Sequence, residues 1–434
     1  MKMEDMIIVS VDDHVVEPPE TFIRHYPTDK KDRAPHVKSF DGSEHWVWTD
    51  TRHLRTGLNA VVGRDRSEYG MEPTSFTQMR KGCYDPKARV EDMDVNGILG
   101  SVNFPSFAGF AGGVMIGKAK KEPEDALLAV RAYNDWHVHE WCGGAPGRLI
   151  PLALLPLWDM AETVAELNRM AKLGVHAISF PDNPTAGGLP SIHNSYWAPV
   201  WKACSDLGMI LNCHIGTGVE PPHASLETPI DAWITTMPMA ISNAAADWLW
   251  APFWKDYPSL RMVLSEGGIG WVPYLLERAD HTFDCHHEWT FTDFGNEKPS
   301  ETFHRHIVTC FIDDRFGLRN LDSLNADMVC YECDYPHADT LWPKAPEYLW
   351  NSVQHLDTST IDKITHANAM RLYNYAPFQA MGGRENCTVG HLRSLARGVD
   401  TAPRKGLGGL KPQEDASQRR PVTSGDILRM FANA

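Results

Sequence analysis

The sequence has no run of apolar residues that approaches the roughly 20 needed to cross a bilayer. Its first ten residues, MKMEDMIIVS, carry acidic side chains and only a short apolar run, so they lack the layout of a secretory signal. Both absences argue against a membrane-embedded or exported protein. We therefore expect a cytoplasmic protein with no membrane partner.

Positive charge is also scarce. The chain has 41 lysines and arginines against 56 aspartates and glutamates, which gives a formal net charge of −15 at pH 7. Nucleic acids and anionic lipids are bound by basic surfaces that displace counterions. The charge balance therefore argues against a nucleic-acid partner and favours a small-molecule substrate.

Cysteine is sparse, and its spacing does not indicate disulfide pairs. The nine cysteines are an odd number scattered through 434 residues, so a disulfide framework is not expected. The one CxxC pair, Cys330 and Cys333, lies in an apolar run typical of a buried strand. Residues three apart on a strand face opposite sides, so we expect this pair to share neither a metal nor a disulfide.

Short β-rich runs alternate with longer segments of helical period, which indicates a parallel sheet wrapped by helices. Apolar residues recur every three or four positions in the segments 124–142, 159–173, 194–207 and 271–285, which predicts helices there. Eight strand–helix units predict an α/β fold closed into a (β/α)8 TIM barrel. The eight predicted strands span residues 6–10, 98–104, 148–155, 176–180, 209–214, 261–266, 305–311 and 327–333.

Two segments do not fit the repeating units of residues 1–378. The interval 15–90 is too long for one connection and is rich in Pro, Asp, Arg and aromatics, so we interpret it as an insertion that lies over the barrel as a lid. Residues 379–434 are polar and rich in Gly and Pro, and they cannot bury a core of their own. They form either a disordered tail or an extended C-terminal arm. We expect the arm, in contact with another subunit of a homo- or hetero-oligomer.

Acidic and imidazole residues follow the predicted strands at corresponding places: Asp12, His14, His214, Glu266 and Asp334. Taken singly, each aspartate could cap a helix or turn, and the histidines could be ordinary buried residues. In a parallel barrel, however, all these strand ends face one rim, where buried charge would be unpaired without a cation. The pattern therefore predicts a metal site in which Asp12 and His14 project to the same side of a D-x-H segment.

The donor types narrow the choice of metal. Carboxylate and imidazole without thiolate suit Zn²⁺, Mn²⁺ or Fe²⁺. Cys213 and Cys333 flank predicted ligands and should point away from them. Structural zinc usually has four thiolate or imidazole ligands in closely spaced pairs, so this set indicates a catalytic site. We expect one divalent ion, with zinc as the first candidate.

Five segments, VDDHVVEP, NCHIGTG, LSEGGIGWVPYLLERAD, CDYPHADTLWP and HANAMRLY, resemble the signature blocks of the amidohydrolase-2 family. That family includes aminocarboxymuconate-semialdehyde decarboxylase and the resorcylate-type decarboxylases, and the resemblance extends over roughly residues 5–378. It implies a distorted (β/α)8 barrel with one divalent metal. The family's first-strand H-x-H pair corresponds to Asp12 and His14 here, and its later metal ligands correspond to His214 and Asp334.

The chain departs from this resemblance at the sixth strand. Some of the decarboxylases have a catalytic histidine there, whereas this sequence has Glu266. A glutamate beside a metal can move protons if its pKa is suitably placed, so Glu266 is a candidate catalytic residue. His337 is the second candidate, and it could orient water or substrate or hydrogen-bond a metal ligand. A strand-end histidine paired with a backbone carbonyl is the alternative.

Further acidic and imidazole residues leave the number of ions open. Glu17 completes a D-x-H-x-x-E pattern and could be an additional ligand, although a solvated or capping acid explains it equally well. His281, His286 and His287 are more simply explained as a surface cluster. If Glu17, Glu266 and one of these histidines turned inward, the site could hold two metals.

Three functions are consistent with these features. The first is a metal-dependent hydrolase or decarboxylase (a carboxy-lyase) acting on a small carboxylated, in particular aromatic, substrate. The second is a dinuclear metal oxygenase, similar to 2-aminoisobutyrate hydroxylase, that works in a hetero-oligomer with a related barrel subunit. The third is a non-catalytic barrel that supports an active homologue, and the complete set of predicted ligands ranks it last.

Overall fold

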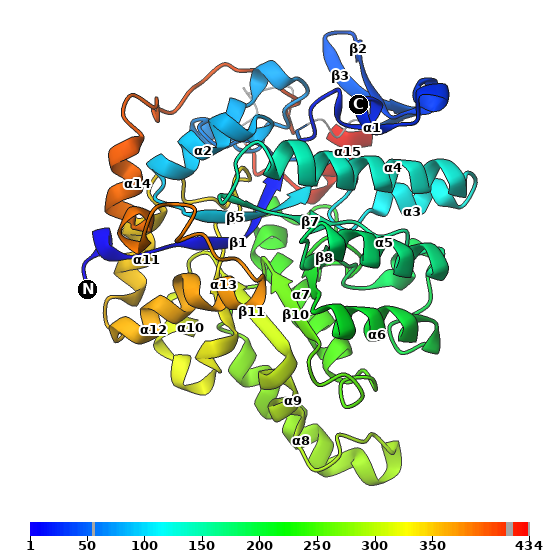
Figure 1. Ribbon diagram of the computed structural model, residues 1–434, viewed down its shortest axis with the longest axis vertical. Helices are drawn as coiled ribbons and strands as arrows, with labels where there is room; N and C mark the ends of the chain where they lie inside the picture. Colours follow the sequence, from blue (N-terminus) through cyan, green and yellow to red (C-terminus); the bar gives the residue numbers. More distant parts are fainter. Residues whose placement is uncertain (54–56, 414–419, 433–434) are drawn as a thin grey trace.

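Short parallel strands surrounded by helices build the centre of the molecule (Figure 1). The computed structural model describes residues 1–53, 57–413 and 420–432. Each predicted strand has a counterpart, displaced by up to a few residues. The strands of the barrel are β1 (Val9–Val15), β5 (Gly100–Pro105), β6 (Leu149–Ile150), β7 (Leu152–Ala153), β8 (Ala177–Ser179), β9 (Ile210–His214), β10 (Arg261–Ser265), β11 (Ile307–Phe311) and β12 (Val329–Tyr331).

The barrel is distorted because its strands form two hydrogen-bonded sheets. One sheet has the order β1-β5-β6 and the other the order β12-β11-β10-β9-β8-β7. The break falls at Pro151, which separates β6 from β7 and cannot donate a ladder hydrogen bond. On the opposite side, the N–H of His14 donates to the carbonyl of Tyr335 at 2.7 Å, and the N–H of Asp334 donates to the carbonyl of Asp12 at 2.9 Å. These bonds close the predicted distorted (β/α)8 barrel.

The strands are buried on both faces, as expected for a parallel sheet covered by helices. Every residue of β1, β5, β9 and β11 is buried. Side chains such as Val9, Val102 and Val263 form the apolar centre of the barrel. The polar side chains of these strands are therefore buried as well, and they need hydrogen-bond or metal partners.

The helices begin and end where local chemistry favours it. Asp159 caps the first helical turn after β7, and Gly208 ends α6 in the left-handed conformation that glycine adopts without strain. Among the described residues, no helix combines the length and apolar character that crossing a bilayer requires. The α-helices are α1 (Thr21–His25), α2 (Pro86–Val95), α3 (Gly113–Ala119), α4 (Pro123–Trp136), α5 (Met160–Lys172), α6 (Ala198–Leu207), α7 (Ile230–Leu249), α8 (Val272–Thr290), α9 (Pro299–His306), α10 (Arg315–Arg319), α11 (Ala345–Val353), α12 (Thr358–Asp362), α13 (Asn368–Leu372), α14 (Val389–Leu395) and α15 (Ser424–Ala432).

The insertion contains regular structure of its own. After α1, the strands β2 (His36–Phe40), β3 (Ser43–Trp48) and β4 (Thr51–His53) form a small antiparallel sheet. This sheet lies at one end of the molecule, near the end of the chain (Figure 1). The insertion ends before α2, which leads into β5. Residues 54–56 of this segment lie outside the described part of the chain.

The predicted arm packs against its own chain where it is described. Residues 384–395 lie against the barrel, where the N–H of Val389 donates to the carbonyl of Met6 at 2.8 Å. This part of the arm therefore packs against the segment that leads into β1. Further on, the N–H of Leu410 donates to the carbonyl of Glu72 at 2.8 Å, so the arm runs along the insertion. Contact with another subunit stays a prediction, and residues 414–419 and 433–434 lie outside the described residues.

Candidate metal centre

The structure brings six of the predicted site residues together at one end of the barrel: Asp12, His14, His214, Glu266, Asp334 and His337. His214 is the last residue of β9, Glu266 directly follows β10, and Asp334 lies just beyond β12. Asp12 and His14 belong to β1 itself, because this strand spans residues 9–15 rather than the predicted 6–10. Strand alternation then turns both side chains to the same face.

The side-chain atoms of this cluster lie at spacings that a single ion can bridge. The Nε2 atoms of His14 and His214 are 3.3 Å apart, and Asp334 Oδ1 lies 3.2 Å from His14 Nε2. Asp12 Oδ2 lies 3.3 Å from His214 Nε2. Ligands about 2.0–2.2 Å from a tetrahedral ion lie about 3.3–3.6 Å from one another. Two groups of three have ligand atoms close enough to share an ion: Asp12, His14 and His214, and a second group of His14, Asp334 and His337.

Buried polar atoms without hydrogen-bond partners also indicate that the cluster suits a metal ion. Both carboxylate oxygens of Asp12 are buried and accept no hydrogen bond from any described residue. His214 directs Nδ1 at the carbonyl of Ile215, 2.6 Å away, which leaves the Nε2 lone pair facing the cluster, 3.3 Å from His14 Nε2. Buried oxygen and nitrogen lone pairs without donors are costly, and a cation removes that cost.

Burial disfavours the charged forms of the carboxyl and imidazole groups in the cluster. Burial raises the pKa of Asp12 well above its ordinary value, and repulsion from neighbouring carboxylates, first Glu332 and then Glu266, adds to the shift. Burial also raises the pKa of Asp334. For His214, burial lowers the pKa to about 3, so the imidazole is neutral, which is the form that coordinates metals. A divalent cation would reverse the penalty on the carboxylates.

The two candidate catalytic residues contact the cluster. Glu266 Oε2 lies 3.2 Å from His214 Nε2, and its side chain is 13% exposed, whereas the side chains of the four candidate ligands are fully buried. Its backbone has φ of 61° and that of Asp334 has φ of 54°, a strained left-handed conformation found at functional sites. His337 Nδ1 lies 2.8 Å from Asp334 Oδ1, and its ring stacks on His14 at 3.8 Å.

Sequence reasoning missed Glu332. Its side chain is fully buried, its Oε2 accepts the N–H of Glu266 at 3.0 Å, and its Oε1 has no partner among the described residues. Burial raises its pKa well above the ordinary value, and Glu266 adds repulsion. The available signal was its position near the end of the predicted strand 327–333, two residues before Asp334.

The structure does not bring Glu17 into the cluster, which corrects its place in the predicted ligand set. Its carboxylate accepts the backbone N–H groups of Phe107 at 2.8 Å, Ala108 at 3.2 Å and Ser106 at 3.3 Å. The reason is strand pairing, since β1 and β5 run side by side and the end of β1 lies next to the loop that follows β5. Glu17 therefore anchors this loop.

Glu17→Gln should change the pH dependence of stability but leave metal content unchanged. Burial raises the pKa of Glu17 from 4.5 to about 7. Its contribution to stability is therefore complete below pH 4.5 and is lost as the pH rises to about 7. Relative to the variant, the wild-type free energy of unfolding should fall by up to about 3 kcal/mol across this range in denaturant titrations.

The exposed Glu20→Gln variant is the control for removing one carboxylate nearby. Loss of metal from Glu17→Gln, with the fold intact, would contradict the assignment of Glu17 as a loop anchor.

The other residues singled out from the sequence lie away from the cluster. Cys213 Sγ lies 3.6 Å from Met262 Sδ, and Cys333 Sγ lies 3.4 Å from the side-chain amide of Asn96, so both thiols point away as predicted. His281 and His286 are exposed on α8. The arrangement agrees with a surface histidine cluster.

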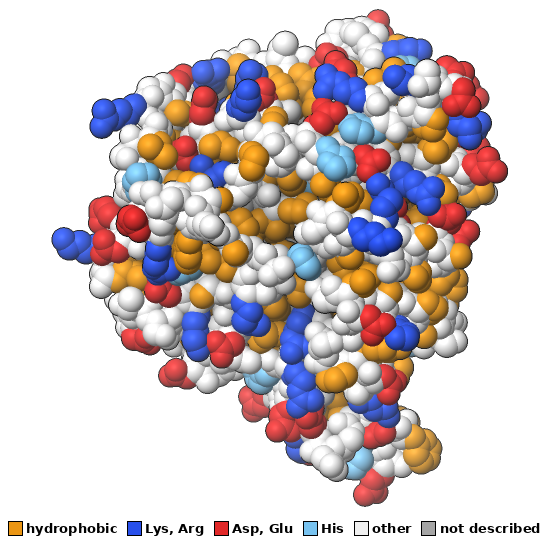
Figure 2. Space-filling model, viewed as in Figure 1, with side chains coloured by type: hydrophobic (Ala, Val, Ile, Leu, Met, Phe, Trp, Pro, Cys, Tyr) orange, Lys and Arg blue, Asp and Glu red, His pale blue; other side chains and the backbone are white. Residues whose placement is uncertain are grey.

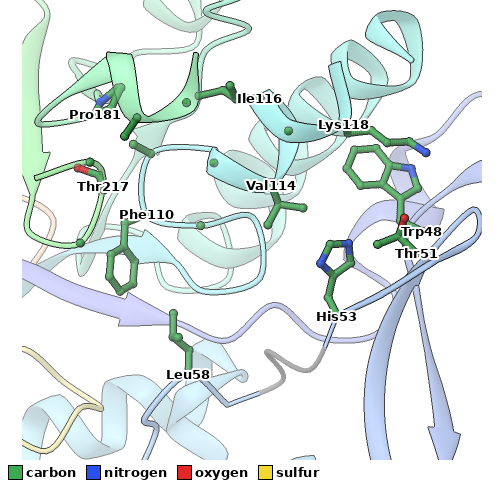
Figure 3. A pocket seen from close by; sticks show the side chains of 18 of the residues that line it. Trp48, Thr51, His53, Leu58, Phe110, Val114, Ile116, Lys118, Pro181 and Thr217 are labelled. Atoms are coloured by element: carbon green, nitrogen blue, oxygen red, sulfur yellow. The ribbon is translucent and has the colours of Figure 1, made fainter. Parts of the chain in front are cut away.

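A pocket of about 1310 Å³ lies beside the cluster. The insertion contributes Trp48 and His53, α3 contributes Val114 and Lys118, and the loop after β5 contributes Phe110 (Figure 3). The space-filling view shows acidic and basic side chains interspersed on one face of the molecule (Figure 2). The pocket lining combines apolar side chains with a few charged ones, which is typical of small-molecule sites.

Comparison with known proteins identifies the fold. A sequence model of the family described as amidohydrolase matches residues 35–375. An amidohydrolase from Mycobacterium avium subsp. paratuberculosis is 18% identical and superposes with a TM-score of 0.64 over 85% of this chain and 99% of its own. The 5-carboxyvanillate decarboxylase of Sphingomonas paucimobilis is 17% identical, with a TM-score of 0.58 over 85% of this chain and 99% of its own.

A dihydroxybenzoic acid decarboxylase from a Polaromonas species, solved with bound manganese and the inhibitor 2-nitroresorcinol, is also similar. It is 18% identical, with a TM-score of 0.54 over 85% of this chain and 96% of its own. At these identities the superpositions show a shared fold.

Proposed function

Because this chain belongs to the amidohydrolase family, we propose that it is a metal-dependent enzyme that decarboxylates a small aromatic carboxylate. The observation that carries the proposal is the buried donor set of Asp12, His14, His214 and Asp334, in which His14 lies 3.2–3.5 Å from each of the other three and His214 lies 3.3 Å from Asp12. The decarboxylases that share the fold support the choice of reaction over hydrolysis. We propose one ion per chain, with zinc, manganese or iron as the candidates.

Each residue has a distinct task in this proposal. Asp12, His14, His214 and Asp334 would hold the ion. When bound, a divalent ion supplies Lewis acidity and an anchor for a carboxylate or phenolate oxygen. Burial of the cluster excludes water and strengthens every electrostatic interaction in it.

Glu266 is the proposed proton carrier. Burial, followed by repulsion from Asp334, raises the pKa of Glu266 well above its ordinary value, so its carboxyl can hold a proton. In decarboxylation the bond between the ring and its carboxylate breaks, carbon dioxide leaves, and the ring carbon takes a proton, which Glu266 would deliver from its carboxyl oxygen. His337 contacts Asp334 and would fix the orientation of that carboxylate.

The test combines metal analysis with a substrate panel. Purified protein should contain one transition-metal ion per chain by mass spectrometry. Carbon dioxide release should be measured from 2,6-dihydroxybenzoate and 5-carboxyvanillate, then after metal removal with dipicolinate and after metal is restored. Activity should disappear and return with stoichiometric metal. Full activity in the metal-free protein would end the proposal.

One observation favours a second candidate, a dinuclear oxygenase. The three buried carboxylates of Asp12, Asp334 and Glu332 lie with the partly exposed carboxylate of Glu266 in one cluster. When ionised, these four groups carry more negative charge than one divalent ion neutralises. Two redox-active ions per chain and substrate-dependent oxygen uptake would favour this candidate. A single zinc ion would exclude it.

A further inference from the structure

The pocket lies next to the metal cluster, but the candidate metal ligands do not line it. Phe110 lines the pocket, whereas none of Asp12, His14, His214 and Asp334 does so in the described part of the chain. The Phe110 ring centroid lies 4.2 Å from that of His214 and 4.7 Å from that of His14. The ring therefore lies between the imidazoles of the cluster and the open space of the pocket.

The cluster is closed in this arrangement. The side chains of Asp12, His14, His214 and Asp334 have no exposed surface. A substrate oxygen could not approach an ion held by these groups from the pocket while the Phe110 ring keeps its position. Since the proposed reaction needs that approach, either the ring moves or the substrate enters by another route.

The loop that carries Phe110 allows side-chain movement on a fixed backbone. Its first half is anchored at residues 106–108 by Glu17, and the carbonyl of Phe110 accepts a hydrogen bond from Ser179 Oγ at 2.6 Å. The ring itself is only partly buried, and in Figure 3 it lies with Leu58 on the side of the pocket away from Trp48 and Lys118. Rotation of the side chain is therefore the movement that the loop permits most easily.

We propose that Phe110 is a specificity-determining residue that separates the pocket from the metal centre and contacts the substrate when its ring swings aside. This inference rests on the proposed function. A flat apolar body would replace the ring's contacts with His14 and His214, while the carboxylate reaches the ion. The apolar pocket walls formed by Val114, Ile116 and Leu58 would receive the rest of the molecule.

The test measures access to the metal directly, without a substrate. Metal-loaded wild type and the Phe110→Ala and Phe110→Leu variants are mixed with dipicolinate, and the rate of metal release is followed. Phe110→Ala should release metal at least about 10-fold faster, which corresponds to a barrier lowered by about 1.4 kcal/mol. Phe110→Leu, which keeps most of the bulk, should fall between. Val114→Ala, a change in the pocket wall that leaves the ring in place, is the matched control.

Equilibrium affinity separates a barrier from a contribution to metal binding. If Phe110 controls access, the rates of metal uptake and release rise together and the Kd is unchanged in Phe110→Ala. Equal release rates in wild type and variant, or a Kd weakened in proportion to faster release, would overturn the inference about Phe110 alone. A wild-type protein that binds no divalent ion would overturn the proposed function as well.

Discussion

His214→Ala should lose its metal and, with it, all decarboxylase activity. His214 Nε2 lies within 3.3 Å of His14 Nε2, Asp12 Oδ2 and Glu266 Oε2, so it is central to the donor set. Changing a residue that only hydrogen-bonds a metal ligand weakens metal affinity by about 10–100-fold. Loss of a direct ligand such as His214 should therefore weaken metal binding by at least about 100-fold. Metal content after gel filtration and competition with a chelator of known affinity measure the effect.

Removing the metal should also remove the stabilisation that it supplies by binding only the folded state. The melting temperature of wild type should rise on addition of the ion, and that of His214→Ala should not respond at the same concentration. His281→Ala is the matched control, because His281 is an exposed histidine on α8. Retention of one ion per chain by His214→Ala would place the metal elsewhere.

The metal cluster could be predicted from the sequence because it depends on strands that are buried on both faces. Runs such as MILNCH and RMVLSE have an apolar centre and end in polar residues, and parallel strands bring those ends to one rim. His214 and Glu266 therefore meet although they are distant in the sequence. The prediction required only the order of the strands, which the apolar runs supplied.

Residues placed by loops could not be predicted in this way. Glu17 was expected near the metal from its spacing to Asp12 and His14, but that spacing describes a strand, and β1 ends at Val15. Beyond that point the partner is the loop after β5, whose backbone N–H groups have no signature in the sequence. Phe110 was missed for the same reason, since its place over the imidazoles follows from the conformation of the loop.

The contacts of the arm could not be predicted for a different reason. It pairs with the insertion through backbone groups, as at Glu72 and Leu410. Backbone pairing between two irregular segments leaves almost no trace in composition or periodicity. The same limit applies to the insertion, whose small sheet consists of short strands with mixed polar and apolar residues.

Glu266→Gln should retain the metal and lose most of the activity. The variant keeps the shape of the side chain but cannot transfer a proton, and loss of a general acid costs about 10²–10⁴-fold in rate. Measured with a substrate found in the panel, kcat should fall by this range while KM changes little. Glu277→Gln, an exposed glutamate on α8, is the matched control.

The pH profile distinguishes proton transfer from metal ligation by the same residue. Burial raises the pKa of Glu266 above its ordinary value of 4.5, so the protonated form persists to higher pH and the wild-type rate should fall as the pH rises through that raised pKa. Glu266→Gln should lack this limb, because an amide does not titrate. If Glu266 were instead a ligand, the variant would lose metal in proportion to activity, and added metal would restore the rate with the wild-type pH profile. The two outcomes assign the partly exposed carboxylate of Glu266 either to proton transfer or to metal binding.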